Sequence, residues 1–144
     1  MPRFYTYSFE DTDLTIQHPS YGSFSAYGTG LGNISISYAN DVTMHDVSAD
    51  AAVVVSKSVK KNGTVTLDIL QSSDFNTWLK GFANYIETAA PSEFARATMV
   101  IRNKSTGEVF TCYGVSHQKK ADTQFQSQSQ DKSWTLMCAN IEYQ

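Results

Sequence analysis

The stretch Thr64-Val65-Thr66-Leu67-Asp68-Ile69 decides the fold of this chain. Polar and apolar side chains alternate at every step, so Val65, Leu67 and Ile69 share one face. A period of two is that of a half-buried β-strand. Similar β-type runs, rich in aromatic and β-branched residues, recur along the chain at residues 33–38, 98–104, 108–116 and 133–143. The pattern therefore predicts a mainly β protein.

Short turn signals separate these runs. The Asn-Gly pair in Lys61-Asn62-Gly63 is a strong hairpin signal, and Lys104-Ser105-Thr106-Gly107 joins two further runs. Near the start, Glu10-Asp11-Thr12-Asp13 indicates a hairpin turn between residues 6–9 and 14–17. Strands at this spacing are typical of an antiparallel β-sandwich or barrel.

One segment, residues 74–89, breaks the period of two. Its large apolar residues recur at helical spacing, which predicts a single amphipathic α-helix that lies against the sheets. Ser73 or Asp74 can cap its first turn, and Pro91 stops it. The expected core stripe of this helix is Phe75, Trp78, Leu79, Phe82 and Ile86.

The chain has 144 residues, which fits a single domain over 1–144. It carries 17 Ser and 14 Thr, only 17% charged residues and a net charge of −3. This balance disfavours disorder and a basic nucleic-acid binder. The chain contains no apolar run of membrane-spanning length, and its first eleven residues lack the apolar core of a secretory signal.

A search for catalytic chemistry finds no motif. His18, His45 and His117 lie far apart in sequence and lack metal-ligand spacing, and the many serines include no nucleophile elbow. Cys112 and Cys138 both fall in predicted strands, where a buried reduced pair is favoured, although a disulfide between adjacent strands remains open. We therefore expect no cofactor, no metal and no enzyme activity.

Four segments need another explanation. The apolar run at residues 52–55 indicates either a strand buried on both faces or a subunit contact. Lys57, Lys60 and Lys61 form the one local basic cluster and are expected at a hairpin tip, solvated or facing another subunit. The Gln- and Ser-rich residues 118–132 predict a long exposed loop or hairpin. The glycines at residues 28–32 are expected to form a turn, because no helix or lysine follows to complete a phosphate loop.

The order of these motifs resembles the tail tube proteins of contractile-tailed bacteriophages. The resemblance spans nearly the whole chain. It departs from the family at Ala51, where the family usually has glycine after an acidic residue. It is carried by Tyr7-Ser8-Phe9-Glu10-Asp11, Leu14-Thr15-Ile16-Gln17-His18-Pro19, the glycines at 28–32, Ile34-Ser35-Ile36, Asp50-Ala51 with Val53, residues 61–67, Leu70-Gln71-Ser72-Ser73, residues 99–103 with Gly107, and Trp134-Thr135-Leu136.

The resemblance implies a structural subunit of a virion tail, assembled in the cytoplasm of the host bacterium. Six copies would form a ring whose sheets join into one continuous β-barrel. Stacked rings would form a hollow tube inside a contractile sheath, and DNA would pass down the lumen without specific binding. The implied partners are further copies of the chain and the sheath, baseplate and tail terminator proteins, with no membrane insertion. The expected contact to the next ring comprises Asp41, Val53, Val54, Val55, Lys57, Lys60 and Lys61.

Two other functions fit the same composition. A stand-alone β-sandwich module that binds carbohydrate or peptide would use exposed aromatic rings for stacking, namely Tyr5, Tyr7, Tyr21, Tyr27 and Tyr38. A small hydrolase with an unrecognised site is the third hypothesis. Assembly into rings and tubes separates the first hypothesis from both of these.

Overall fold

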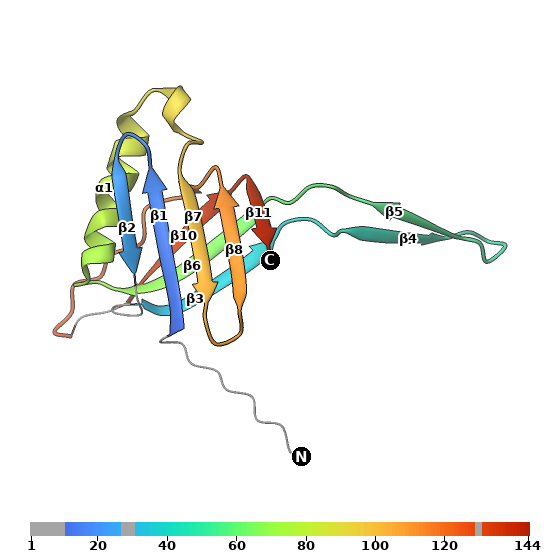
Figure 1. Cartoon of the computed structure of the whole chain (residues 1–144), viewed down its shortest axis with the longest axis horizontal. Helices are drawn as coiled ribbons and strands as arrows, with labels where there is room; N and C mark the ends of the chain where they lie inside the picture. Colours follow the sequence, from blue (N-terminus) through green and yellow to red (C-terminus); the bar gives the residue numbers. More distant parts are fainter. Residues whose placement is uncertain (1–10, 27–30, 129–130) are drawn as a thin grey trace, which may run out of the picture.

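The computed structural model describes residues 11–26, 31–128 and 131–144. Two antiparallel sheets pack face to face (Figure 1), and a separate two-stranded hairpin extends away from them. The five-stranded sheet has the order β11-β8-β7-β1-β2. Its strands are β1 (Thr12–His18), β2 (Gly22–Ala26), β7 (Thr98–Asn103), β8 (Glu108–Tyr113) and β11 (Asn140–Tyr143).

The four-stranded sheet has the order β3-β6-β10-β9, with β6 and β10 in the centre. Its strands are β3 (Leu31–Tyr38), β6 (Gly63–Leu70), β9 (Ser116–His117) and β10 (Asp131–Cys138). The third sheet contains only β4 (Thr43–Val47) and β5 (Val53–Lys57). The predicted mainly β, antiparallel architecture with one helix is confirmed, and over the described ranges it is a sandwich rather than a closed barrel.

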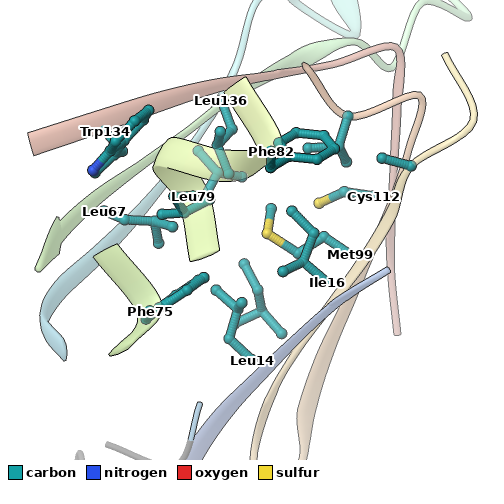
Figure 2. Packing of buried hydrophobic residues seen from close by; sticks show 14 of the residues in the cluster. Leu14, Ile16, Leu67, Phe75, Leu79, Phe82, Met99, Cys112, Trp134 and Leu136 are labelled. Atoms are coloured by element: carbon teal, nitrogen blue, oxygen red, sulfur yellow. The ribbon is translucent and has the colours of Figure 1, made fainter. Parts of the chain in front are cut away.

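The core lies between the two sheets, as Figure 2 shows. Val65, Leu67 and Ile69 of β6 are fully buried, as the alternation predicted. In the neighbouring strand, Trp134 and Leu136 pair with Leu67 and Val65 and extend the same apolar layer. The five-stranded sheet supplies the facing layer, which includes the buried side chains of Leu14, Ile16 and Met99.

Helix α1 (Asp74–Thr88) runs alongside the sandwich and matches the predicted bounds within one residue. It begins at Ser73, whose Oγ accepts a 3.2 Å hydrogen bond from the backbone N–H of Asn76. A 3-10 turn, η2 (Pro91–Glu93), follows it. Four residues of the stripe, Phe75, Leu79, Phe82 and Ile86, are buried, whereas Trp78 is half-buried and stacks on Phe82.

Two turn predictions were wrong. Thr12 and Asp13 do not turn but begin β1, because they pair with Asn103 and Arg102 of β7; the predicted strand at 6–9 lies outside the described residues. Asn62-Gly63 does not close a hairpin either, since β5 pairs with β4 and β6 pairs with β3 and β10.

The two cysteines are free thiols, and both are buried in the core. Cys112 lies in β8 of one sheet and Cys138 at the end of β10 in the other. The hydrogen bond with Cys138, together with burial, raises the pKa of Cys112. A neutral buried thiol behaves as a small apolar side chain, so the pair contributes packing between the sheets.

Candidate functional site

The most distinctive feature of the surface is the projecting hairpin, which we call the arm (residues 39–62). Figure 1 shows it extending from the ends of β3 and β6, well clear of the sandwich. Its ladder pairs β4 with β5 from Thr43 opposite Lys57 to Val47 opposite Val53. All ten residues of the two strands are exposed. An isolated two-stranded hairpin is at best marginally stable in water, so this shape favours a partner that covers it.

The arm exposes an apolar surface of unusual extent. Val47 is 70% exposed and Val53, Val54 and Val55 are 53%, 58% and 59% exposed. Val42, Met44 and Val59 add to the same segment. Contiguous exposed apolar side chains on an unprotected strand pair are typical of an interaction surface. Of the two hypotheses for residues 52–55, the strand buried on both faces is therefore wrong, because Val53, Val54 and Val55 are all more than half exposed and no described segment of the chain covers them.

The charges of the arm divide along its length. Lys57, Lys60 and Lys61 lie where the arm returns to the sandwich, not at a hairpin tip as predicted. Asp41 lies on the other side of the same base, and both groups are exposed. The distal half, residues 46–53, contains two aspartates and no lysine or arginine. The run of valines at 53–55 marks this segment in the sequence, whereas Val42, just before β4, and Met44 and Val47 within it are separated by polar residues and form no such run.

A tight turn, residues 48–52, closes the arm. The N–H of Ala51 donates to the Ser48 carbonyl at 3.0 Å, and the N–H of Ser48 donates to the Ala52 carbonyl at 2.9 Å. Ala51 has a φ of 67°, a left-handed conformation that favours glycine. The hydroxyl of Ser48 and the N–H of Ala52 donate to the Asp50 carboxylate, and these bonds lower the pKa of Asp50.

The outward face of the four-stranded sheet has a different character. Opposite the buried layer, aligned side chains form cross-strand rows, such as Ser35 beside Thr66 and Thr66 beside Thr135. The charged residues on this face are Asp68 and Asp131, with no lysine or arginine at an outward position of β3, β6 or β10. The hydroxyl-bearing side chains of this hydroxyl face are Ser35, Ser37, Thr64, Thr66, Ser133 and Thr135.

The histidines do not assemble into a catalytic or metal site. His18 is buried, where its Nε2 lies 2.9 Å from the Glu93 carbonyl oxygen and its Nδ1 accepts from the N–H of Ser20. His45 is exposed on the arm, and His117 lies 3.3 Å from a Glu87 oxygen. In the part of the chain that the structure describes, no three His, Cys, Asp or Glu side chains come together to hold a metal. No helix there is long and apolar enough to span a membrane.

The aromatic residues do not form a stacking platform for a ligand within the described ranges. Tyr21 packs against the helix, with its ring stacked on Tyr85 and its hydroxyl donating to the Trp78 carbonyl at 3.4 Å. Tyr38 is about half exposed, at the end of β3. The remaining tyrosines of that hypothesis, Tyr5, Tyr7 and Tyr27, lie outside the described residues.

The geometry defines a class: an antiparallel β-sandwich with one flanking helix and an exposed apolar arm. The family model of the Bacteriophage PhiTE tail tube protein matches residues 4–144, and the chain belongs to this family. It is therefore a non-enzymatic structural component of the virion tail. No curated protein matches it by sequence.

Solved structures with the same fold come from contractile injection systems. One is the sheath/tube terminator of the extracellular contractile injection system PVC in the extended state, with 9% identity, a TM-score of 0.57 and coverage of 98% of each chain. Another is the tube-terminating cap of the anti-feeding prophage, with 8% identity and a TM-score of 0.57 over 100% of this chain and 94% of that one. A chain of the PVC sheath-tube complex has 10% identity and a TM-score of 0.56, covering 97% and 92%. At these identities the similarity establishes the fold.

Proposed function

We propose that six copies of this chain form a ring, that the rings stack into a hollow tube, and that DNA leaves the virion through its lumen. The single observation that carries the proposal is the exposed apolar arm on a sandwich of the tail tube family. The chain acts as one tail-tube domain over residues 1–144. Its partners in the tail are the sheath, the baseplate and the tail terminator, and assembly takes place in the host cytoplasm.

The arm is the proposed contact between rings. Burial of its valines removes apolar surface from water, at about 25 cal/mol per Å². Six arms act together in each ring, so even a modest contribution from each one stabilises the stack strongly. Asp41, Lys57, Lys60 and Lys61 surround the base of the arm and provide a charged rim to an apolar contact formed by Val53–Val55.

The hydroxyl face is the proposed wall of the lumen. Joining the open edge of β3 to the sheet of a neighbouring copy continues the four-stranded sheet and pairs an otherwise exposed edge. The hydroxyl face then repeats around the ring with two carboxylates per copy, Asp68 and Asp131, and with no lysine or arginine at the outward positions of β3, β6 and β10. Lysines or arginines on this wall would bind phosphates and retard the DNA, whereas hydrated hydroxyls and carboxylates do not.

Assembly of the purified chain tests the proposal. Negative-stain microscopy at high protein concentration is expected to reveal rings and stacked tubes about a hundred ångströms across, from six domains of about 35 Å around a pore. A strictly monomeric protein would contradict it.

A shortened arm separates ring formation from stacking. Replacing residues 44–56 with Asn-Gly places a two-residue turn between Thr43 and Lys57, which already lie opposite each other. We expect a folded chain that forms single rings without tubes. Normal tubes from this variant would show that the arm is not the contact between rings.

A further inference from the structure

A cationic pocket lies beside α1, at the opposite side of the sandwich from the arm. It has a volume of about 250 Å³ and opens between the helix, the start of β10 and residues 120–123. Each of these elements contributes one lysine to the lining, namely Lys80, Lys132 and Lys120. Asn84 and Thr123 add an amide and a hydroxyl, and no Asp or Glu lines the pocket. We call this site the lysine pocket.

Lys132 has an unusual position for a lysine. It occupies an inward-facing site of β10, in line with Trp134 and opposite the fully buried Ile69, and it is only 5% exposed. Over the described residues no carboxylate pairs with its ammonium. Burial and the charge of Lys80 both lower the pKa of Lys132. The ammonium of Lys132 faces the pocket beside a second cation, Lys80, and an anion bound there would offset the repulsion between the two charges.

The mouth of the pocket is held in place by the helix. Glu87 of α1 lies 3.0 Å from the Lys120 Nζ and 3.3 Å from the His117 Nε2, and the hydrogen bonds with these two side chains lower the pKa of Glu87. These contacts fix residues 117–120 against α1. They also neutralise Lys120 alone, so the charges of Lys80 and Lys132 stay uncompensated within the described part of the chain.

The distal half of the arm is the acidic surface that complements this pocket. Asp46 is exposed on β4 and lies directly opposite Val54, so a carboxylate and a valine share one face. The Asp50 carboxylate is engaged within the turn, which leaves Asp46 as the carboxylate available to a partner. In Figure 1, whose horizontal axis is the longest one, the arm occupies one end of the molecule and α1 the other.

This placement favours a head-to-tail contact between identical copies. When copies stack along their long axis, the arm of one approaches the α1 end of the next. A heterologous contact of this kind does not close on itself and produces an open stack. We propose that the lysine pocket of one subunit binds the arm of a subunit in the next ring, with Asp46 as its anionic ligand. The inference rests on the proposed function, since it assumes that the arm joins rings.

A charge swap in the full chain tests the pairing. Lys80→Glu and Asp46→Lys are each expected to raise the protein concentration needed for tubes about tenfold, because each opposes like charges in the contact. Both changes in one chain restore an opposite-charge pair at every contact and should return that concentration to within about threefold of the wild-type value. Lys104→Glu, the same charge change on the exposed β7–β8 turn, is the matched control and should form tubes normally.

A second variant guards against misfolding. Lys132→Met keeps the apolar stem of the side chain and removes the charge, and it should weaken stacking while single rings persist. The inference is overturned if Lys80→Glu forms tubes at the wild-type concentration, or if the double variant is as defective as the single ones. Tubes from the chain with the shortened arm would instead overturn the proposed role of the arm, so the two failures are distinguishable.

Discussion

The indole Nε1–H of Trp134 donates a 3.0 Å hydrogen bond to the Oδ1 of Asn76, and both side chains are buried. The amide nitrogen of Asn76 in turn donates to the Gln71 carbonyl at 2.9 Å. This pair of bonds joins the centre of the four-stranded sheet to the first turn of α1. The register between helix and sheet is therefore fixed by polar groups that are satisfied inside an apolar core.

The first prediction concerns this bond. Asn76→Ala leaves the buried indole N–H without an acceptor and is expected to lower the free energy of unfolding by about 2–3 kcal/mol. Urea unfolding followed by circular dichroism measures the change. Asn84→Ala, at an exposed position of the same helix, is the matched control and should change it by no more than about 0.5 kcal/mol. Equal decreases in the free energy of unfolding for the two variants would show that the hydrogen bond to Trp134 does not contribute to stability.

Ala51 provides the second prediction. A non-glycine residue in the left-handed region costs about 1–2 kcal/mol, so Ala51→Gly should stabilise the arm by about 1 kcal/mol. The change should slow amide exchange in β4 and β5 about fivefold and leave the exchange of β6 unaltered. Ala52→Gly, at the next residue, lacks the left-handed strain to relieve and should speed exchange instead. Faster exchange in Ala51→Gly would contradict the strained turn.

A third prediction follows from Asp50. Hydrogen bonds from Ser48 and Ala52 hold the pKa of this carboxyl below its ordinary value of 3.8. The folded turn therefore gains stability that is fully present above pH 3.8 and is lost as the pH falls through the lower folded pKa. Amide shifts of Ser48 and Ala52 should follow this transition in an acid titration. Asp50→Asn should remove it, and an unchanged titration in that variant would assign the transition to another group.

The alternation of residues 64–69 and the helical stripe made the sandwich and α1 predictable, because both patterns state directly which side chains are buried. The arm was not predictable in the same way. A run of valines has the same local pattern in a buried strand and in an exposed one. Its hydrophobicity indicates that it favours burial, but not whether the covering surface belongs to the same chain or to a partner. The charges at the base and tip of the arm became distinguishable only once the β4–β5 register was known.

Gly63 illustrates a second limit. The Asn62-Gly63 pair has the composition of a hairpin turn, yet here it marks where the arm rejoins the sandwich. A Cβ at this position would clash with the Ser37 carbonyl oxygen of β3 and with the side chain of Ile141. The glycine is needed for close approach between strands that are distant in sequence, and no local pattern distinguishes that requirement from a turn.

The last prediction separates stability from assembly. Val54 is 58% exposed on β5, so Val54→Asp removes little buried surface and should change the free energy of unfolding by less than about 0.5 kcal/mol. The new carboxylate replaces a valine of the proposed apolar contact and lies directly opposite Asp46, so the contact loses apolar burial and gains repulsion between two like charges. We expect folded single rings and no tubes, measured by urea unfolding and negative-stain microscopy. Phe82→Ala, in the core, should instead lower stability by about 3–5 kcal/mol. A strong loss of stability in Val54→Asp would show that this valine is covered within the chain, and normal tubes would exclude it from the contact.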